Sequence, residues 1–348
     1  MRSSTSSSND RLPRGGWGRT WALTTLLVLV PLAIWEIWWR SRGFRPSVEA
    51  ADESWVLALH QVPAATAVAL GTSRIQAALD PEALQREIGG RPTIDLALPG
   101  NSPIPLLEYL ADSVRYAGLV IVEILPLYAF DAEQSGATRA QILIQRYGRE
   151  RVSPARLTEN WLEVHLLSPF VFRKAQLLPA RLVQTLRAGE PIEPHPGRMR
   201  PDRFMPIDQR RYQAKNGWDS VSGFHGMTYP GVERPGRPAN DAEYAALKGR
   251  ILGATNRILD RGGQVVLLYM AACGERRRIE ERRYPRARYW DPLERETRAI
   301  AIATEDYPEL SRFACWDGSH IDAADAPAWA GAFGRIIRSR IRTPSPLR

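Results

Sequence analysis

The chain has 348 residues, of which 44% are hydrophobic, and this allows one large domain with an insertion or two smaller domains. Its formal net charge is +9, and almost all of the basic excess is arginine, so its surface could meet nucleic acid, anionic lipid or an acidic polymer. No nucleic-acid-binding motif and no glycine-rich phosphate loop occurs, so we expect no nucleic-acid partner and no nucleotide chemistry.

The first feature along the chain is an apolar segment, Trp21 to Trp39, after a Ser-, Gly- and Arg-rich stretch over residues 1–20 that we expect to be a disordered basic tail. The segment holds one charged residue, Glu36, has tryptophans at both ends, and as a helix would span about 29 Å, the thickness of a bilayer core. We predict a single-pass anchor in the inner (cytoplasmic) membrane, with the rest of the chain facing the periplasm or exterior. The competing interpretation is a signal peptide cleaved near Val48-Glu49-Ala50, but that site lies far past the apolar segment.

Short apolar segments then alternate with helical patterns, which is typical of βαβ units in a parallel sheet. Over residues 51–130 we predict strands at 65–70, 93–98 and 119–125, and helices at 81–89 and 103–117.

The pattern changes over residues 131–238, which we interpret as an insertion that forms a lid over the site. Helices are predicted at 137–147 and 154–187, and 188–238 is irregular and rich in Pro, Gly and Arg. The alternation resumes over 239–342, where we predict, in order, a helix capped by Asn240, a strand at 264–270, a helix at 291–303, a short strand or turn at 313–316, and a helix at 325–341. The expected fold is a three-layer α/β/α sandwich of about five parallel strands in a flavodoxin-like order.

Two polar segments at opposite ends of this pattern contain the parts of a Ser-His-Asp triad. Leu70-Gly71-Thr72-Ser73-Arg74 follows the first strand, and Trp316-Asp317-Gly318-Ser319-His320 follows the last short strand or turn. A serine hydroxyl needs a neighbouring base to take its proton, and that base needs a group that orients it. We therefore predict Ser73 as the nucleophile, His320 as the base and Asp317 as the orienting carboxylate. In isolation, Gly-Thr-Ser is a common loop tripeptide and Asp-x-x-His can simply cap a helix.

The two segments together resemble the SGNH/GDSL hydrolase family, and within it the membrane-anchored members that modify cell-envelope polymers, similar to the DltD and alginate O-acetylation proteins. The match lies in Gly71-Thr72-Ser73-Arg74-Ile75 followed by Asp80-Pro81. The resemblance implies an oxyanion hole built from a glycine and an asparagine, and Gly100 matches the glycine. The family's Gly-x-Asn-Asp segment after the third strand is replaced by Val122-Glu123-Ile124-Leu125-Pro126, so Asn101 is the candidate substitute donor.

The resemblance implies serine-dependent ester chemistry, by an O-acyltransferase or an esterase, on a cell-envelope or exported polysaccharide. It implies a multi-spanning membrane acyltransferase as a partner that donates the acyl group, and no metal or organic cofactor. The alternative is a catalytically inactive protein of the same fold that binds glycan or partner proteins, which the missing asparagine segment favours. Cys273 and Cys315 form either one disulfide or two buried free thiols, and the exported location allows the first.

Overall fold

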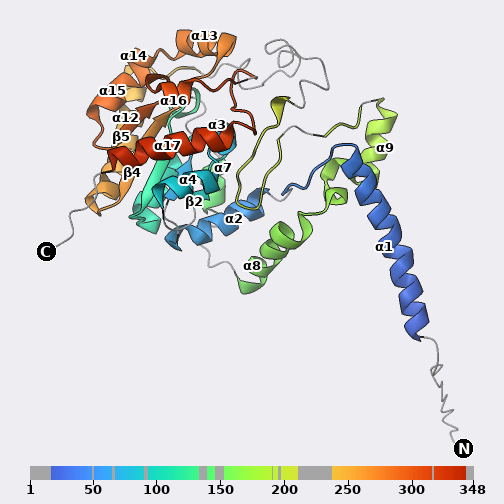
Figure 1. Cartoon of the computed structure of the whole chain (residues 1–348). Coiled ribbons are helices and arrows are strands. Elements are labelled where there is room, and N and C mark those ends of the chain that lie inside the picture. Colours follow the sequence, from blue (N-terminus) through green and yellow to red (C-terminus); the bar gives the residue numbers. More distant parts are fainter. Residues whose placement is uncertain are drawn as a thin grey trace, which may run out of the picture. The chain divides into compact units, whose positions relative to one another are not determined.

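The structure is a computed structural model (Figure 1). The chain divides into two compact units. One unit comprises Met1–Pro46 with Phe170–Pro194, and the other comprises Ser47–Pro169 with His195–Arg348. The residues that the structure describes are 17–48, 51–64, 67–89, 93–132, 139–145, 153–189, 191–194, 197–210, 237–315 and 317–341.

The larger unit is built on a five-stranded, all-parallel sheet with the strand order β2-β1-β3-β4-β5 (Figure 1). Its strands are almost completely buried, which explains why the sequence shows continuous apolar runs instead of alternation. β1 is an interior strand, because Ala67 pairs with β2 on one side and with β3 on the other. The strands are β1 (Ala67–Leu70), β2 (Thr93–Asp95), β3 (Leu119–Glu123), β4 (Gln264–Tyr269) and β5 (Ile300–Ala303).

Helices surround the sheet, and their buried side chains belong to two hydrophobic clusters. Val68 and Leu70 of β1 join one cluster and Ala67 and Ala69 the other, because successive side chains of a strand point in opposite directions. The first cluster includes side chains of α2 (Ala51–Gln61), α5 (Ile104–Tyr109), the π-helical turn η2 (Leu110–Val114), α12 (Asp241–Asp260), α14 (Arg286–Tyr289) and α15 (Asp291–Glu296). The second includes side chains of α3 (Ser73–Ala78), α4 (Pro81–Ile88), α16 (Pro308–Ser311) and α17 (Ala326–Arg340).

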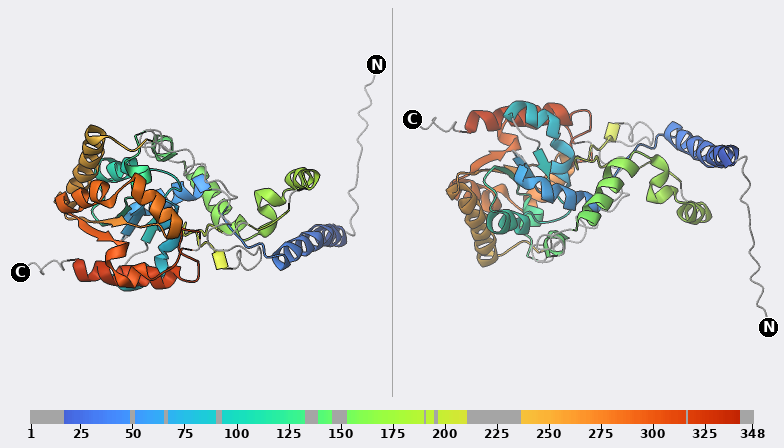
Figure 2. Two further views of the ribbon diagram at one scale, coloured as in Figure 1. Left: turned by 90° about the horizontal axis from the view of Figure 1, so that it is seen from above. Right: turned by 90° about the horizontal axis from the view of Figure 1, so that it is seen from below.

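Local sequence explains how several of these helices begin and pack. The Asn240 side chain accepts from the Glu243 backbone N–H at 3.0 Å while the Glu243 carboxylate accepts from the Asn240 N–H at 2.9 Å, a capping box that begins α12 as predicted. α17 packs closely on α4 (Figure 2), where a Cβ at Gly334 would lie 2.7 Å from the Glu87 Cβ. The remaining short helices of the unit are η1 (Val62–Ala64), α6 (Pro126–Ala129), α7 (Arg139–Leu143), α8 (Pro154–Trp161), the π-helical η4 (Leu162–Leu167), α13 (Gly274–Arg283) and η7 (Thr304–Asp306).

The fifth strand differs from the prediction. A single helix over 291–303 is wrong, because α15 ends at Glu296 and residues 300–303 pair in parallel with β4. Pairing with the exposed edge of β4 outweighs the weak local helical pattern there. Residues 313–315 form no strand and Trp316 lies outside the described residues, so the loop at 317–320 follows α16 and not a strand.

The predicted helix over 154–187 is also interrupted. It divides into α8 and η4 in the larger unit, and η5 (Val171–Arg173), η6 (Ala175–Leu177) and α9 (Pro179–Arg187) in the smaller one. Pro179 begins α9 because proline fits the first helical turn and not a helix interior. In the predicted lid, residues 211–236 lie outside the described residues.

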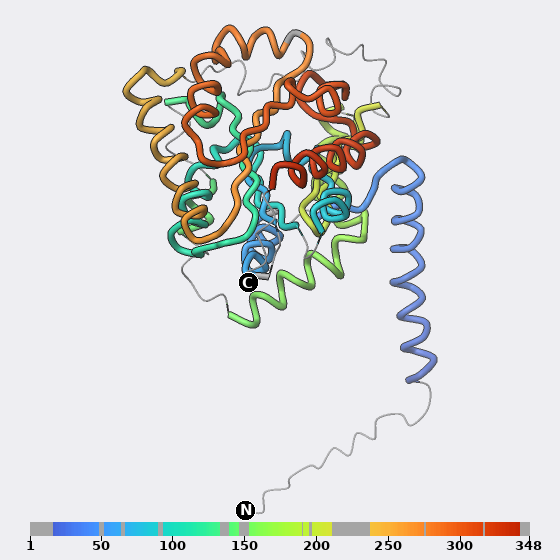
Figure 3. The backbone as a smooth tube through the Cα atoms, turned by 60° about the vertical axis from the view of Figure 1, so that its left-hand side comes forward, coloured from blue at the N-terminus to red at the C-terminus, as the bar shows by residue number. Residues whose placement is uncertain are grey.

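The smaller unit contains the predicted anchor. α1 (Trp17–Ser41) runs for 25 residues without interruption (Figure 3), and it is long and apolar enough to cross a membrane. Residues 1–16 of the predicted tail lie outside the described residues. The end of α1 packs against the segment of η5, η6 and α9 through a small cluster of buried side chains, namely Trp39, Phe44, Val171, Leu177 and Leu182.

Candidate active site

The three residues of the predicted triad lie in hydrogen-bond contact, although Ser73 and His320 are 247 residues apart in the chain. His320 Nε2 lies 2.8 Å from Ser73 Oγ, and His320 Nδ1 lies 2.6 Å from Asp317 Oδ2. His320 is 5% exposed, so this array is shielded from water while the serine remains partly accessible. A hydroxyl, an imidazole and a carboxylate are therefore connected in the order that acyl-transfer chemistry requires.

The charge of Asp317 determines which nitrogen of His320 carries the proton. Burial alone would raise the pKa of this carboxyl, but the His320 imidazole and the backbone N–H groups of Ser319 and His320 lower it to about 2. Those two N–H groups donate to Asp317 Oδ1 at 2.8 and 2.7 Å. An ionised Asp317 holds the imidazole proton on Nδ1, so that Nε2 is the acceptor that faces the Ser73 hydroxyl.

The nucleophile turn joins the end of β1 to α3. Thr72 caps the helix, and its hydroxyl accepts from the Arg74 N–H at 3.3 Å, so Ser73 occupies the first helical position. Gly71 has a φ of +150°, and a Cβ there would lie 2.6 Å from both Cβ and Oε2 of Glu123. Only glycine allows this close passage of the backbone over β3.

Glu123, the last residue of β3, supports the nucleophile turn through hydrogen bonds to its side chain. Its Oε2 accepts from the Thr72 N–H at 2.7 Å and from the Thr72 hydroxyl at 2.9 Å. Burial raises the pKa of Glu123, and the Thr72 N–H and the Arg74 guanidinium oppose that rise. No local sequence pattern around Glu123 indicates this supporting role.

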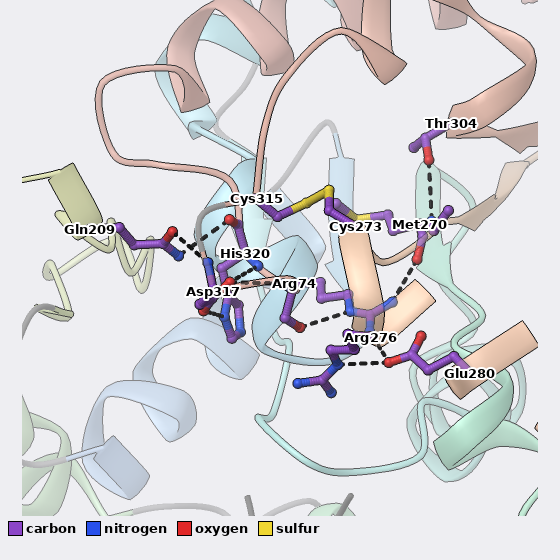
Figure 4. The surroundings of a disulfide bond; sticks show 12 residues. Arg74, Gln209, Met270, Cys273, Arg276, Glu280, Thr304, Cys315, Asp317 and His320 are labelled. Carbon is purple, nitrogen blue, oxygen red and sulfur yellow. Dashed lines mark hydrogen bonds and ion pairs between the residues drawn. A yellow bond between two sulfur atoms is a disulfide. The ribbon is translucent and has the colours of Figure 1, made fainter. Parts of the chain in front are cut away.

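Arg74 connects α3 to the loop Asp317–His320, hereafter the base loop, and it is 1% exposed. Its guanidinium donates to the Met270 carbonyl at 2.8 Å and to Glu280 (Figure 4). It also donates to the Ser319 hydroxyl at 3.1 Å. Burial would lower the pKa of Arg74, but Glu280 and Glu123 raise it, so the side chain stays charged. Its place directly after the nucleophile was the only sequence signal for this role.

A disulfide holds the base loop, which settles the alternative left open for the cysteines. Cys273 and Cys315 are bonded with their Cα atoms 5.7 Å apart (Figure 4). The Cys273 N–H donates to the Gly318 carbonyl at 2.9 Å, and the Gly318 N–H donates to the Cys315 carbonyl at 3.0 Å. Gly318 has a φ of +77°, and a Cβ there would lie 3.2 Å from the Arg276 Cβ, so the loop requires glycine at this point.

The insertion also reaches the base loop, through Gln209. Its Oε1 accepts from the Asp317 N–H at 3.1 Å, and its Nε2 donates to the His320 carbonyl at 3.3 Å (Figure 4). Asp322 in turn accepts from the Gln209 and Arg210 N–H groups, each at 3.0 Å. Gln209 therefore clamps both ends of the Asp317–His320 turn, a contact that no local sequence pattern signals.

The predicted oxyanion loop lies beside the nucleophile turn, because the Leu98 N–H donates to the Gly71 carbonyl at 3.0 Å. Gly100 has a φ of +70°, and a Cβ there would have Tyr128 Oη, at 4.0 Å, as its nearest neighbour. The Asn101 amide donates to the Pro99 carbonyl at 2.7 Å, and its Oδ1 accepts from the Arg139 N–H at 2.9 Å. The Asn101 side chain is thus engaged with its own loop and α7.

Within the described residues, no group of three or more His, Cys, Asp or Glu side chains is arranged to hold a metal ion. Neither a protein-family model nor a curated protein matches this chain.

Proposed function

We propose that this chain is a serine esterase or O-acyltransferase of the SGNH type that acts on a cell-envelope or exported polysaccharide. One observation carries the proposal: the hydrogen-bonded array Ser73–His320–Asp317, with contacts of 2.8 and 2.6 Å. The strand order 2-1-3-4-5 and the two hydrophobic clusters support a flavodoxin-like three-layer fold, in which sites form at the carboxyl ends of the strands.

In this mechanism Ser73 Oγ attacks the acyl carbonyl carbon while its proton passes to His320 Nε2. The Asp317 carboxylate stabilises the imidazolium that forms, and His320 then protonates the departing alcohol oxygen to leave an acyl group on Ser73. In the second half, His320 takes a proton from water or from a sugar hydroxyl while that oxygen attacks the acyl carbon. His320 then returns the proton to Ser73 Oγ as the bond between Oγ and the acyl carbon breaks, which regenerates the free serine. Water as the acceptor gives hydrolysis, and a sugar hydroxyl gives transfer.

The negative oxygen of the tetrahedral intermediate needs hydrogen-bond donors. The backbone N–H groups of Ser73 and Gly100 are the proposed donors, and the Asn101 amide could join them only if it releases the Pro99 carbonyl. The Tyr128 hydroxyl is a further candidate, because it lies at the Gly100 loop and burial raises its pKa, which keeps it protonated. One such donor contributes about 10²–10³-fold to kcat, so Tyr128→Phe should slow acylation by about 10²-fold.

Two features of the chain support an envelope substrate. α1 is a candidate membrane span at the amino-terminal side of the α/β unit, and the Cys273–Cys315 disulfide suits an oxidising compartment. We place the α/β unit in the periplasm, anchored in the inner membrane, with a multi-spanning acyl donor as the proposed partner. The engaged side chain of Asn101 favours the second candidate function, a non-catalytic protein that binds glycan.

Labelling with a fluorophosphonate separates the two candidates. The full-length protein in detergent should acquire one phosphonyl adduct, which peptide mapping should place on Ser73. Ser73→Ala should prevent the adduct, and the matched control Ser339→Ala, an exposed serine on α17, should not. A folded wild-type protein that acquires no adduct would support the binding function. Isotope-labelled acetyl esters then divide hydrolysis, which yields free acetate, from transfer, which yields acetylated glycan.

A further inference from the structure

Glu36 is the one charged residue of the predicted anchor segment, and the triad mechanism gives it no role. Its carboxylate accepts from the Val171 N–H at 2.9 Å, from the Phe172 N–H at 3.0 Å and from Arg40 Nε at 2.6 Å. The Glu36 side chain is 13% exposed. A carboxylate near the apolar core of a bilayer is costly unless it is paired, and these three donors satisfy it.

Apolar contacts secure the same junction. Trp39 and Phe44 are each 2% exposed, and their ring centroids lie 5.0 Å apart at an edge-to-face angle. Val171, Leu177 and Leu182 complete the cluster, so η5, η6 and α9 all contribute to it. Residues 170–187 are thus fixed at the level of the last turns of α1.

The surface of this segment is both apolar and basic. On α9, Leu186 is 65% and Val183 is 47% exposed, and Phe170 before η5 is 42% exposed. Leu178, Leu182 and Leu186 recur every four residues, so the apolar face of α9 extends beyond the buried Leu182. Residues 170–189 contain no Asp or Glu, and their basic residues are Arg173, Lys174, Arg181 and Arg187.

The end of α1 has the features of a membrane boundary at the same level. Trp35 and Trp38 are exposed, and the Arg42 guanidinium lies 4.0 Å from the centroid of the Trp38 ring. Tryptophan and arginine prefer the headgroup region, where a ring and a charge can both be accommodated. Because Glu36 holds residues 171 and 172 one turn before Arg40, Phe170 lies in that region when α1 spans a bilayer.

We propose that residues 170–187 form a second membrane-binding element that lies among the headgroups of the bilayer spanned by α1 and binds anionic phospholipid. Glu36 fixes its depth, its exposed apolar side chains, Phe170, Leu178, Val183 and Leu186, enter the boundary of the acyl chains, and its arginines meet lipid phosphates. The inference rests on the membrane anchor of the proposed function and is independent of the triad.

The test uses the full-length protein in vesicles of phosphatidylcholine and phosphatidylglycerol. The two native cysteines are bonded to each other, so one introduced cysteine is the free thiol that accepts an environment-sensitive fluorophore. The labelled variants are Leu186→Cys and Phe170→Cys, with Gln184→Cys on the polar side of α9 as the matched control and Leu29→Cys within α1 as the reference for the anchor. Lipids with a shallow quencher should quench the labels at 170 and 186 about twofold or more above that at 184, and less so in phosphatidylcholine alone.

Further variants and outcomes distinguish failure of the headgroup-binding element from failure of the membrane anchor. Glu36→Gln should reduce quenching at 170 and 186 and leave that at 29 unchanged, whereas Glu281→Gln, an exposed charge on α13, should change none of them. Equal quenching at 184 and 186, with the label at 29 quenched by deep lipid probes, would overturn the interface element and retain the anchor. An unquenched label at 29 would overturn the anchor itself. Shielding of 186 in native membranes but not in pure lipid would assign this surface to a protein partner and overturn the lipid proposal.

Discussion

The two sides of the triad are held by different means. Ser73 follows an interior strand directly, and its turn rests on the buried side chains of Glu123 and Arg74. His320 lies on a loop after a short helix, and a disulfide, Gly318 and the side chain of Gln209 hold that loop. A catalytic residue at the end of a strand takes its position from the sheet, whereas one on a loop needs support from distant parts of the chain.

Buried carboxyl groups at the ends of the strands and on the base loop have pKa values shifted in opposite directions. Burial raises the pKa of Glu123 at the end of β3, and it raises that of Asp95 at the end of β2 to about 7. The pKa of Asp317 on the base loop is about 2, because His320 and backbone N–H groups outweigh burial. The contribution of Asp95 and Glu123 to the free energy of unfolding is therefore lost as pH rises. The contribution of Asp317 is lost as pH falls below about 4.

The largest expected effect is the loss of activity when either Ser73 or His320 is replaced, because the proposed mechanism needs both side chains. Ser73→Ala and His320→Ala should each lower kcat for an acetyl ester by roughly 10⁴–10⁶-fold. The double variant should be little worse than either single one, since the residues act as a unit. Initial rates measured on folded protein test this expectation. Multiplicative losses would mean that Ser73 and His320 act independently.

Removal of the disulfide should affect the base side selectively. The bond closes a loop with a sequence separation of 42, for which chain entropy predicts a loss of about 4 kcal/mol in the free energy of unfolding when both cysteines become serine. Denaturant unfolding of Cys273→Ser/Cys315→Ser in detergent measures this loss. In the folded fraction, kcat should also fall, because Asp317 and His320 lose their brace. Unchanged stability and unchanged kcat would show that Gly318 and Gln209 hold the loop without it.

Asp95→Asn should sharpen the contrast in pH response. The folded-state pKa of Asp95 lies above its unfolded value of about 3.9, so its contribution is complete below about pH 4 and is lost as pH rises through about 7. In the wild type the Ala97 N–H donates to Asp95 Oδ1 at 2.8 Å. Asparagine keeps this acceptor oxygen and does not ionise. The variant should gain roughly 2–4 kcal/mol relative to wild type between about pH 4 and pH 7. Unfolding midpoints that differ by the same amount at both pH values would contradict this assignment.

Gln209→Ala should give the smallest of these effects. The substitution removes both hydrogen bonds to the Asp317–His320 turn, and a displacement of about 1 Å costs up to roughly 10²-fold in rate. We expect kcat to fall by about ten- to hundredfold with KM unchanged, since Gln209 acts through the turn. The matched control is Gln184→Ala on α9, which should leave both constants unchanged. A change in KM alone would instead place Gln209 at the substrate.

The parts of the fold and site that could be predicted are those written in short local patterns. β1 to β4 and the groups of the triad fall within a few residues of their predicted positions, since an apolar run or an Asp-x-x-His spacing is visible without the rest of the chain. β5 was not predicted, because Ile300–Ala303 become a strand only through pairing with β4. The contacts of Arg74 and Gln209 join residues 196 and 108 positions apart, a distance at which no periodicity carries information.

The glycines of the site differ in how far evolution or a mutant library could alter them. At Gly71 any side chain would meet Glu123 and Ile75 within 2.8 Å, so this position should tolerate no replacement. At Gly100 the surroundings are open to 4.0 Å, and its left-handed backbone also suits asparagine. Under the proposed ester chemistry, new acyl or acceptor preferences should therefore arise by substitution at Gly100, which leaves the turn from Gly71 to Ser73 unaltered.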